Sequence, residues 1–404
     1  MSELAAYETD WTGRWHGRAR GLERPTSTGE LAEVLARCAR DRIPVTTAGG
    51  RTGLVGGAVP PEDGTAIVVS TERLRSPVEI TDGVVTVAAG VPLAQVQHAA
   101  RAAGYEYGVD LAARDSASIG GTVATDAGGV HVIGHGTTAA QVLGVEAVLA
   151  DGTVVDTTPE LPKVALGPDL TQLLVGSEGV LGIISRVRLR LHRPPARVSV
   201  ARIDVADISA AVQVLARLRA IADVRAVEYA EAPVVDRSHV LVEVEGPVEA
   251  FAALEGLDIA AAADDATGRA RLWSVREGVT ERVARESTDR GAPVHKLDVA
   301  VPVRALPDFR RALADVVADD DLRLWGHLAE GNLHVNVWGD DGIDARVLDL
   351  VLAHGGAISS EHGIGRAKVD AFARAHPQRA ALLRRVKDAY DPQWLLNPGV
   401  LVRR

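Results

Sequence analysis

Two histidines, His327 and His334, lie within the segment W-G-H-L-A-E-G-N-L-H-V-N-V that begins at residue 325. Apolar residues flank Glu330-Gly331, and a glycine at the second position of a two-residue turn is typical of a tight β-hairpin. Such a turn would place the two imidazoles opposite each other on one face. Two imidazoles and one carboxylate form a ligand set for zinc or a similar divalent cation, and Glu361 is the candidate carboxylate. The alternative is a cross-strand histidine pair that binds only water.

The composition limits the classes of protein to which the chain can belong. Its 404 residues are enough for two or three domains. The formal net charge of −10 argues against binding to nucleic acid or to an anionic membrane surface. One cysteine, Cys38, excludes a disulfide framework and a cysteine-ligated iron–sulfur cluster, and it fits a cytoplasmic location. We expect no transmembrane segment, because no apolar run reaches about 18 residues.

Three glycine-rich loops, each next to a predicted strand, lie at residues 48–57, 115–129 and 176–182. Glycine lets the backbone approach a ligand closely and present its N–H groups to an anion. The first loop matches neither the P-loop pattern, since no Gly-Lys-Ser/Thr follows, nor the dinucleotide pattern G-x-G-x-x-G. A flexible linker is the alternative for one loop alone. Three loops suit a long ligand with more than one polar segment.

The remaining elements follow from capping, periodicity and chain breakers. A capping box at residues 27–30 predicts a helix that ends near Asp41, and a second helix is expected over residues 92–103. Pro194-Pro195 then breaks the chain. Beyond it, strand-like runs alternate with helical ones, which predicts an α+β domain with helices on one face. An amphipathic helix is expected over residues 271–285.

The glycine loops, G-G-R-T-G-L-V-G-G, S-A-S-I-G-G-T-V-A-T-D-A-G-G and G-S-E-G-V-L-G-I in this order, resemble the FAD-binding domain of the vanillyl-alcohol oxidase/p-cresol methylhydroxylase superfamily. The second half resembles the FAD-linked oxidase C-terminal domain of glycolate oxidase D subunits, D-lactate dehydrogenases and D-2-hydroxyglutarate dehydrogenases. The resemblance implies an α+β fold with a two-part FAD-binding domain over residues 1–194. It further implies an α+β, ferredoxin-like cap or substrate domain over residues 195–354, and a segment over residues 355–404 that returns to the FAD domain.

The same resemblance implies non-covalent FAD, since no residue stands as an evident attachment site. The first two loops would surround the pyrophosphate, the third would lie at the adenine side, and Asn397 would return to the flavin. The residues expected to bind FAD are Gly49, Gly50, Arg51, Thr52, Gly53, Leu54, Gly56, Ser116, Ser118, Gly120, Gly121, Thr125, Gly128, Gly129, Glu178, Gly179, Ile183 and Asn397.

The second glycine loop departs from the family pattern at two positions. Thr122 and Asp126 stand where asparagine is usual. A carboxylate near a pyrophosphate is unfavourable unless it is paired or turned away. Arg51 in the first loop is a candidate to offset that charge.

Substrate-binding and catalytic residues are also implied by the resemblance. Arg276, Thr280 and Lys296 match the residues that hold a substrate carboxylate, and His362 matches the general base. On the residues alone, a solvated helix charge is the favoured interpretation of Arg276, and His362 could equally be a surface histidine. Asn336 follows His334 on the same face and is expected to bind substrate by a hydrogen bond.

The hypothesis is oxidation of a D-2-hydroxy acid to a 2-oxo acid. The cation, zinc or else manganese or iron, would bind the hydroxyl, His362 would take its proton, and hydride would pass to FAD. The electron acceptor is not specified, since an electron-transfer flavoprotein, a quinone or oxygen would each serve, and a homodimer is left open. Three alternatives remain: an FAD oxidase of a sugar, lactone or natural product, a flavin-free metallohydrolase, and a non-catalytic FAD-binding subunit.

Overall fold

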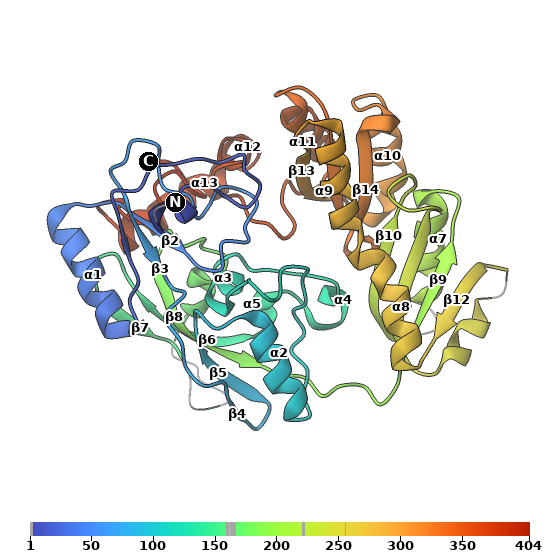
Figure 1. Cartoon of the computed structure of the whole chain (residues 1–404), viewed down its shortest axis with the longest axis horizontal. Coiled ribbons are helices and arrows are strands. Elements are labelled where there is room, and N and C mark those ends of the chain that lie inside the picture. The colour runs from blue at the N-terminus through green and yellow to red at the C-terminus, as the bar shows by residue number, and fades with distance from the viewer. Residues whose placement is uncertain (1–2, 159–160, 162–166, 220–222, 255) are drawn as a thin grey trace. The chain divides into compact units, whose positions relative to one another are not determined.

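The chain folds into two compact units (Figure 1). The computed structural model describes residues 3–158, 161, 167–219, 223–254 and 256–404. The first unit comprises Met1–Gly128, Gly136–Pro194 and Glu361–Arg404, and the second comprises Gly129–His135 and Pro195–Ser360. The final division therefore follows Ser360, whereas the sequence places it before residue 355. The sequence gives no signal for the short excursion of residues 129–135 into the second unit.

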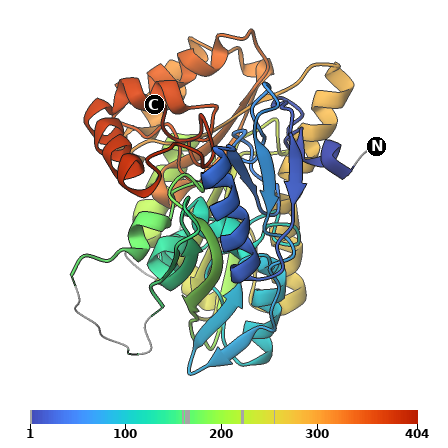
Figure 2. The same ribbon diagram turned by 90° about the vertical axis from the view of Figure 1, so that its left-hand side faces the viewer.

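Within the described ranges, the first unit contains a parallel sheet with the order β1-β3-β2. Helix α1 (Thr28–Asp41) packs on it through Leu31, Leu35 and Cys38, and Figure 2 shows this helix in the foreground. The Ser27 hydroxyl accepts the Glu30 amide, and the Glu30 carboxylate accepts the Thr26 amide at 2.7 Å. This confirms the predicted helix start, with the acceptor reaching one residue further back than in a standard capping box. The strands are β1 (Gly21–Glu23), β2 (Val45–Ala48) and β3 (Ile67–Ser70).

An antiparallel sheet with the order β4-β5-β8-β6-β7 forms the rest of the first unit's framework. Its core consists mainly of valine, leucine and isoleucine, with Tyr107 as a buried aromatic residue. The strands are β4 (Glu79–Thr81), β5 (Val84–Ala88), β6 (Val142–Val148), β7 (Val154–Asp156) and β8 (Ile183–Arg190). The other helices of this unit are η1 (Glu3–Tyr7), α2 (Leu93–Ala102), α3 (Ile119–Ala124), α5 (Thr138–Gln141), α6 (Thr171–Leu174), α12 (Val369–Ala375) and α13 (Pro377–Tyr390).

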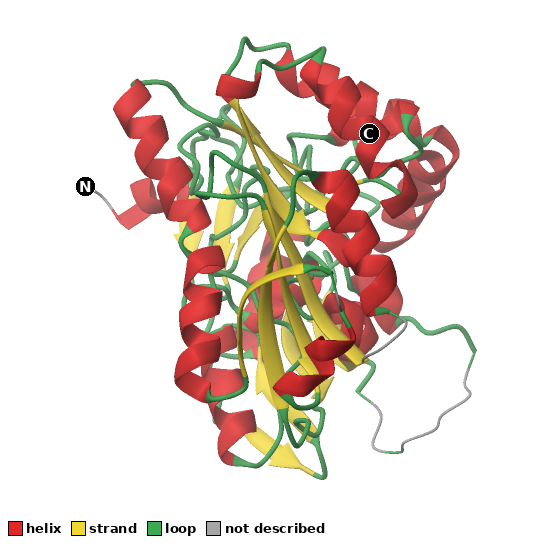
Figure 3. Ribbon diagram, turned by 90° about the vertical axis from the view of Figure 1, so that its right-hand side faces the viewer, coloured by secondary structure: helices red, strands yellow, loops and turns green. Residues whose placement is uncertain are grey.

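The second unit is built on an antiparallel sheet with the order β12-β9-β11-β10-β14-β15-β13 (Figure 3). Helices lie on both faces, with α8 and α9 along one and α7 and α10 along the other (Figure 1). The prediction of helices on one face is therefore wrong, and the central strands β11 and β14 are buried on both sides. The strands are β9 (Val198–Asp204), β10 (Asp223–Ala230), β11 (His239–Glu245), β12 (Asp258–Ala263), β13 (His295–Ala300), β14 (Leu322–His327) and β15 (Asn332–Val337). The helices are α4 (Val132–His135), α7 (Ile208–Leu218), η2 (Val248–Ala253), α8 (Ala266–Glu277), α9 (Val279–Arg290), η3 (Val303–Ala305), α10 (Leu306–Ala314), η4 (Asp319–Asp321) and α11 (Ile343–Ala353).

The helix predicted over residues 271–285 is divided into α8 and α9 at Gly278. The Gly278 amide donates to the Ser274 carbonyl, and the Gly278 carbonyl accepts the Arg282 amide. The chain thus kinks at a glycine that ends α8 and begins α9.

Strands β14 and β15 are joined by the short helix η5 (Leu328–Glu330) and Gly331, which has φ 72°. The predicted two-residue turn is therefore wrong, because Leu328 and Ala329 are buried in the core instead of continuing a strand. His334 pairs with Trp325 in the ladder and not with His327. This shift of two residues keeps His327 on the same face as His334, since strand side chains alternate with a period of two.

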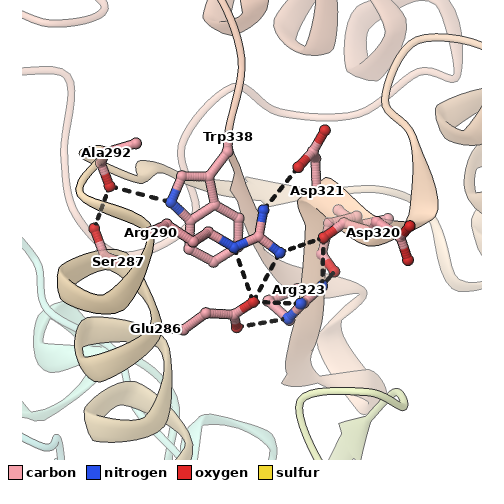
Figure 4. Close-up of polar contacts among 9 residues, drawn as sticks. Glu286, Ser287, Arg290, Ala292, Asp320, Asp321, Arg323 and Trp338 are labelled. Atoms are coloured by element: carbon pink, nitrogen blue, oxygen red, sulfur yellow. Dashed lines mark hydrogen bonds and ion pairs between the residues drawn. The ribbon is translucent and has the colours of Figure 1, made fainter.

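The C-terminal half of α9 is fixed to β14 by a cluster of charged side chains around Trp338 (Figure 4). Glu286 of α9 accepts Arg323 Nε of β14 at 2.8 Å and Arg290 Nε at 3.0 Å. The Arg290 guanidinium also lies 4.1 Å from the centre of the Trp338 ring. This cluster sets the position of α9, whose first turn carries Thr280.

Within the described ranges, every helix is too short or too polar to traverse a lipid bilayer.

Candidate active site

Polar side chains from four neighbouring strands share one face of the second unit's sheet. The ladder pairs Glu228 of β10 with His327 of β14. It also pairs His334 of β15 with Asp298 of β13, and Asn336 with Lys296. Polar groups this close together on a sheet face need mutual hydrogen bonds or a ligand, because unpaired burial is costly.

Two of these residues, His327 and His334, form a cluster with Glu361 in which the possible ligand atoms all lie within 4.8 Å of one another. The two imidazole rings are 5.4 Å apart and nearly perpendicular. Glu361 directly follows Ser360, whose amide donates to Asp298 Oδ2 at 3.0 Å, so the second unit holds the backbone next to Glu361. The structure thus brings together the three residues selected from the sequence. Two imidazoles and a carboxylate suit zinc, manganese or iron.

Glu228 was missed by the sequence analysis, although a glutamate within the apolar strand V-R-A-V-E-Y-A is unusual. Its side chain is 2% exposed. Oε1 lies 2.5 Å from His327 Nδ1, and Oε2 accepts Arg276 Nε, also at 2.5 Å. Burial raises the pKa of Glu228, but the charges of His327 and Arg276 outweigh this effect and lower it overall. The Nδ1 bond makes Nε2 the nitrogen with which His327 would bind a cation.

Asp298 is a second buried acid on this face. It is fully buried and accepts Asn332 Nδ2 at 2.8 Å as well as the Ser360 amide. Its Oδ1 lies 4.0 Å from His334 Nδ1. Asp298 therefore ties β13 to the start of β15 and to the segment that carries Glu361.

The predicted substrate-binding residues come from four elements, the helices α8 and α9 and the strands β13 and β15. Arg276 is in the last turn of α8 and Thr280 in the first turn of α9, while Lys296 and Asn336 are ladder partners. Arg276 is not the solvated helix charge that was one alternative, since Glu228 holds its Nε and its side chain is only 12% exposed. Its two Nη groups then form the edge that can pair with a carboxylate. Burial lowers the pKa of Lys296.

His362, the predicted base, precedes a backbone turn that Glu178 holds within the first unit. The two oxygens of Glu178 accept the amides of Ile364 and Gly365 at 2.8 and 2.7 Å. Burial raises the pKa of Glu178 against the lowering effect of these two amides. The sequence assigns Glu178 to FAD, but its carboxylate is committed to the turn after His362.

Asn397, which the sequence assigns to FAD, makes hydrogen bonds with two segments of the first unit. Its Oδ1 accepts the Thr47 amide at 2.7 Å, and its Nδ2 donates to the Glu178 carbonyl at 2.6 Å. Its own amide donates to the Val45 carbonyl. The side-chain amide therefore joins β2 to the third glycine loop.

The first two glycine loops pack against each other closely. A Cβ on Gly50 would lie 2.1 Å from the Ser116 carbonyl oxygen, and one on Gly120 would lie 2.5 Å from the Ala89 Cβ. Ser118 Oγ accepts the amides of Gly50 and Gly121. A Cβ on Gly53, in contrast, would meet nothing within 4 Å. The loops are thus fixed on one side and open on the other, which fits a ligand that lies along their backbone.

The departures in these loops have structural explanations. Asp126 accepts the Ala139 amide at 2.7 Å, and burial raises the pKa of Asp126. Arg51 does not offset it, because its guanidinium binds the Ala6 carbonyl and stacks on the Tyr7 ring. Thr122 donates its hydroxyl to the Ile119 carbonyl at 2.9 Å.

Comparison with known proteins identifies the family. The family model described as "FAD binding domain" matches residues 19–158, and the one described as "FAD linked oxidases, C-terminal domain" matches residues 194–401. The chain belongs to the FAD-linked oxidase family. As a member of this family it is an FAD-dependent oxidoreductase, as the sequence predicts.

Relatives within the FAD-linked oxidase family include dehydrogenases of 2-hydroxy acids. The chain is 34% identical to D-2-hydroxyglutarate dehydrogenase of Xanthomonas citri pv. viticola, over 99% of this chain and 93% of that protein. It is 32% identical to D-lactate dehydrogenase of Archaeoglobus fulgidus, over 94% and 91%. A solved structure of alkyldihydroxyacetonephosphate synthase matches with a TM-score of 0.71 at 15% identity, over 93% of this chain and 75% of that one. This last match shows a shared fold only.

Proposed function

We propose that this protein oxidises a D-2-hydroxy acid to the corresponding 2-oxo acid with the aid of a divalent cation. The proposal is supported chiefly by the cluster of His327, His334 and Glu361. Its two histidines lie on the same sheet face as Lys296 and Asn336. The relatives named after D-2-hydroxyglutarate and D-lactate favour a 2-hydroxy acid over a sugar or lactone.

In this proposal the substrate carboxylate is held by the Nη groups of Arg276, by the Lys296 ammonium and by the Thr280 hydroxyl. Arg276 is already oriented by Glu228, so little of its conformational freedom is lost when substrate binds. Lys296 is partly desolvated, which strengthens its attraction for an anion. Fixing the carboxylate at these groups orients the reacting carbon and removes most of the entropic cost of alignment.

His362 then accepts the hydroxyl proton at one ring nitrogen, a role that suits imidazole near neutral pH. Asn336 donates a hydrogen bond to the substrate. A cation bound by His327, His334 and Glu361 supplies positive charge that lowers the pKa of the substrate hydroxyl. Bound FAD supplies the hydride acceptor. We propose zinc as the cation, and manganese and iron suit the same ligands.

The test is an anaerobic absorbance titration of the FAD-containing protein with D- and L-2-hydroxy acids, before and after treatment with a chelator. We expect one D-acid to bleach the flavin band and chelation to slow that bleaching strongly. Bleaching by a sugar or lactone alone would contradict the substrate class. Equal bleaching rates with and without the chelator would contradict the role of the cation.

His362→Ala tests the proposed base. We expect the flavin to stay bound and its rate of reduction to fall by roughly 10²- to 10⁴-fold, the usual contribution of a general base. His376→Ala is the control, because His376 lies at the start of α13 and has no proposed catalytic role. A variant with the wild-type rate of reduction would exclude His362 as the base.

A further inference from the structure

Glu228 connects a residue of the proposed cation site with a residue of the proposed carboxylate site. Its position in the ladder is opposite His327, and α8 brings Arg276 to its other oxygen. The two bonds are equally short, at 2.5 Å each. One buried carboxylate therefore sets the orientation of both side chains.

The two bonds are not independent, because they end on the same rigid, planar group. A cation on Nε2 would fix the His327 ring and, through Nδ1, the plane of the Glu228 carboxylate. Fixing that plane fixes the direction of Arg276 Nε, and with it the Nη edge of the guanidinium. Ordering caused by one ligand is then already complete when the second ligand binds.

We propose that Glu228 is a positioning residue that couples cation binding at His327 to carboxylate binding at Arg276, so that each ligand strengthens the binding of the other. This inference rests on the proposed function, since it takes both sites from it. The coupling must be reciprocal, and couplings of this kind typically change affinity by roughly 5- to 150-fold.

The same sheet offers a matched control in Glu243 of β11. This glutamate is also buried, and its Oε1 accepts Arg225 Nε at 3.0 Å and lies 3.1 Å from His131 Nε2. It thus holds one arginine and one histidine, as Glu228 does. Neither of these partners, nor Trp273, whose indole N–H donates to Glu243 Oε2, belongs to the cluster of His327, His334 and Glu361. Glu243→Gln removes the same charge from the same sheet without touching the proposed bridge.

The experiment measures the dissociation constant of zinc for the FAD-containing protein by competition with a chromophoric chelator. Each measurement is made with and without a saturating carboxylate that lacks the 2-hydroxyl, glutarate in one series and propionate in another. Such a carboxylate can bind Arg276 but offers no hydroxyl to the cation. A carboxylate that ligated zinc directly, or attracted it only through its charge, would keep its effect in Glu228→Gln, so the part of the effect that this variant loses is the part that passes through Glu228.

For wild type and Glu243→Gln we expect the carboxylate to lower the zinc dissociation constant about fivefold or more. For Glu228→Gln we expect zinc to bind roughly 10- to 100-fold more weakly, and the carboxylate to have no effect. Should Glu228→Gln fail to fold, Glu228→Asp keeps the charge but is too short to reach both partners, and it should bind zinc without responding to the carboxylate.

Three results would overturn the proposal. The first is an unchanged carboxylate effect in the Glu228 variants, and the second is an equal loss in Glu243→Gln. The third is a wild-type protein that binds zinc with no response to either carboxylate. Failure of wild type to bind zinc at all would overturn the proposed cation site as well, so the two failures are distinguishable.

Discussion

Two buried glutamates on adjacent strands of one sheet, Glu228 and Glu243, solve the same physical problem with the same kinds of partner. Each holds an arginine and a histidine, which is how a carboxylate remains charged away from water. They differ in how their oxygens are shared. Glu228 gives one oxygen to each partner, whereas Glu243 binds both partners through Oε1 and the Trp273 indole through Oε2.

The histidines also differ in the nitrogen that faces the carboxylate. His131 uses Nε2, and His327 uses Nδ1, which leaves its Nε2 side for the cluster with His334 and Glu361. A buried ion pair is therefore not in itself evidence of a functional site. What distinguishes Glu228 is that one of its partners, His327, belongs to a cluster that could hold a metal ion, and the predictions below test that distinction.

The largest expected difference is between His327→Ala and His131→Ala. Zinc binding free energies of about 10–16 kcal/mol, divided over three or four ligands, imply a loss of roughly 10²- to 10⁴-fold in affinity per ligand. We therefore expect His327→Ala to be isolated without zinc and His131→Ala with wild-type zinc content. Metal analysis of the two purified proteins checks this. Equal zinc content in both would remove His327 from the ligand set and with it the basis of the comparison.

The next largest effect is the contribution of the Glu243 carboxylate to the stability of the folded protein. Burial alone would raise the pKa of Glu243, but the hydrogen bonds and charges of His131 and Arg225 have the larger effect. Together they lower this pKa from the ordinary 4.5 to about 2. Because the folded-state pKa is the lower one, this carboxylate stabilises the fold fully above pH 4.5, and the contribution is lost as the pH falls toward 2. The shift corresponds to roughly 3 kcal/mol.

Melting curves of wild type and Glu243→Gln, recorded between pH 7 and pH 3, test this expectation. The melting temperature of the variant should be lower at pH 7, and the difference should shrink below pH 4.5. Zinc affinity should not change. A gap that stays constant with pH would mean that the variant loses packing or hydrogen bonds and not the charge.

A smaller effect is expected when Arg276, the partner of Glu228, and Arg225, the partner of Glu243, are each replaced by lysine. Arg276→Lys removes the Nε bond to Glu228 and the two-pronged edge offered to substrate, whereas Arg225→Lys makes the same change at Glu243. A charge-assisted hydrogen bond contributes about 1.5–3 kcal/mol, so we expect Arg276→Lys to raise the half-saturating hydroxy-acid concentration by at least about tenfold. Rapid-mixing measurements of flavin reduction supply this concentration. A similar rise in Arg225→Lys would show that both arginines act only through the fold.

The sequence predicted the cluster of His327, His334 and Glu361 although it did not predict the connection between β14 and β15. The two strands are antiparallel in either register, and the observed shift of two residues leaves side chains on their predicted face. Local signals were similarly reliable at α1, where Ser27 and Glu30 form the expected cap. Such features depend on a few neighbouring residues.

Glu228 could not be predicted as the partner of His327, because the contact depends on the order of strands in the sheet. The two residues are 99 positions apart, and β10 lies next to β14 only because the sheet follows a non-sequential order. The same reason applies to the backbone contacts made by the side chains of Glu178 and Asn397, two residues that the family pattern assigns to FAD. Both bind backbone groups from distant segments, and a motif does not reveal whether a side chain serves the ligand or the loop that holds it.

The smallest effect is expected at Thr280, and it tests whether the proposed carboxylate site extends from Arg276 to the first turn of α9. Thr280 lies just beyond the kink at Gly278, and Thr280→Val keeps the shape of the side chain but removes the hydroxyl proposed to bind the carboxylate. Loss of one hydrogen bond costs about 0.5–1.5 kcal/mol, so the half-saturating hydroxy-acid concentration should rise roughly 2- to 10-fold while zinc affinity stays the same. Thr288→Val is the control on the same helix, because the Thr288 hydroxyl only donates to the Ala284 carbonyl at the exposed end. If both variants behave as wild type, the carboxylate site ends at Arg276 and Lys296, and α9 only supports them through the Glu286–Arg323 contact.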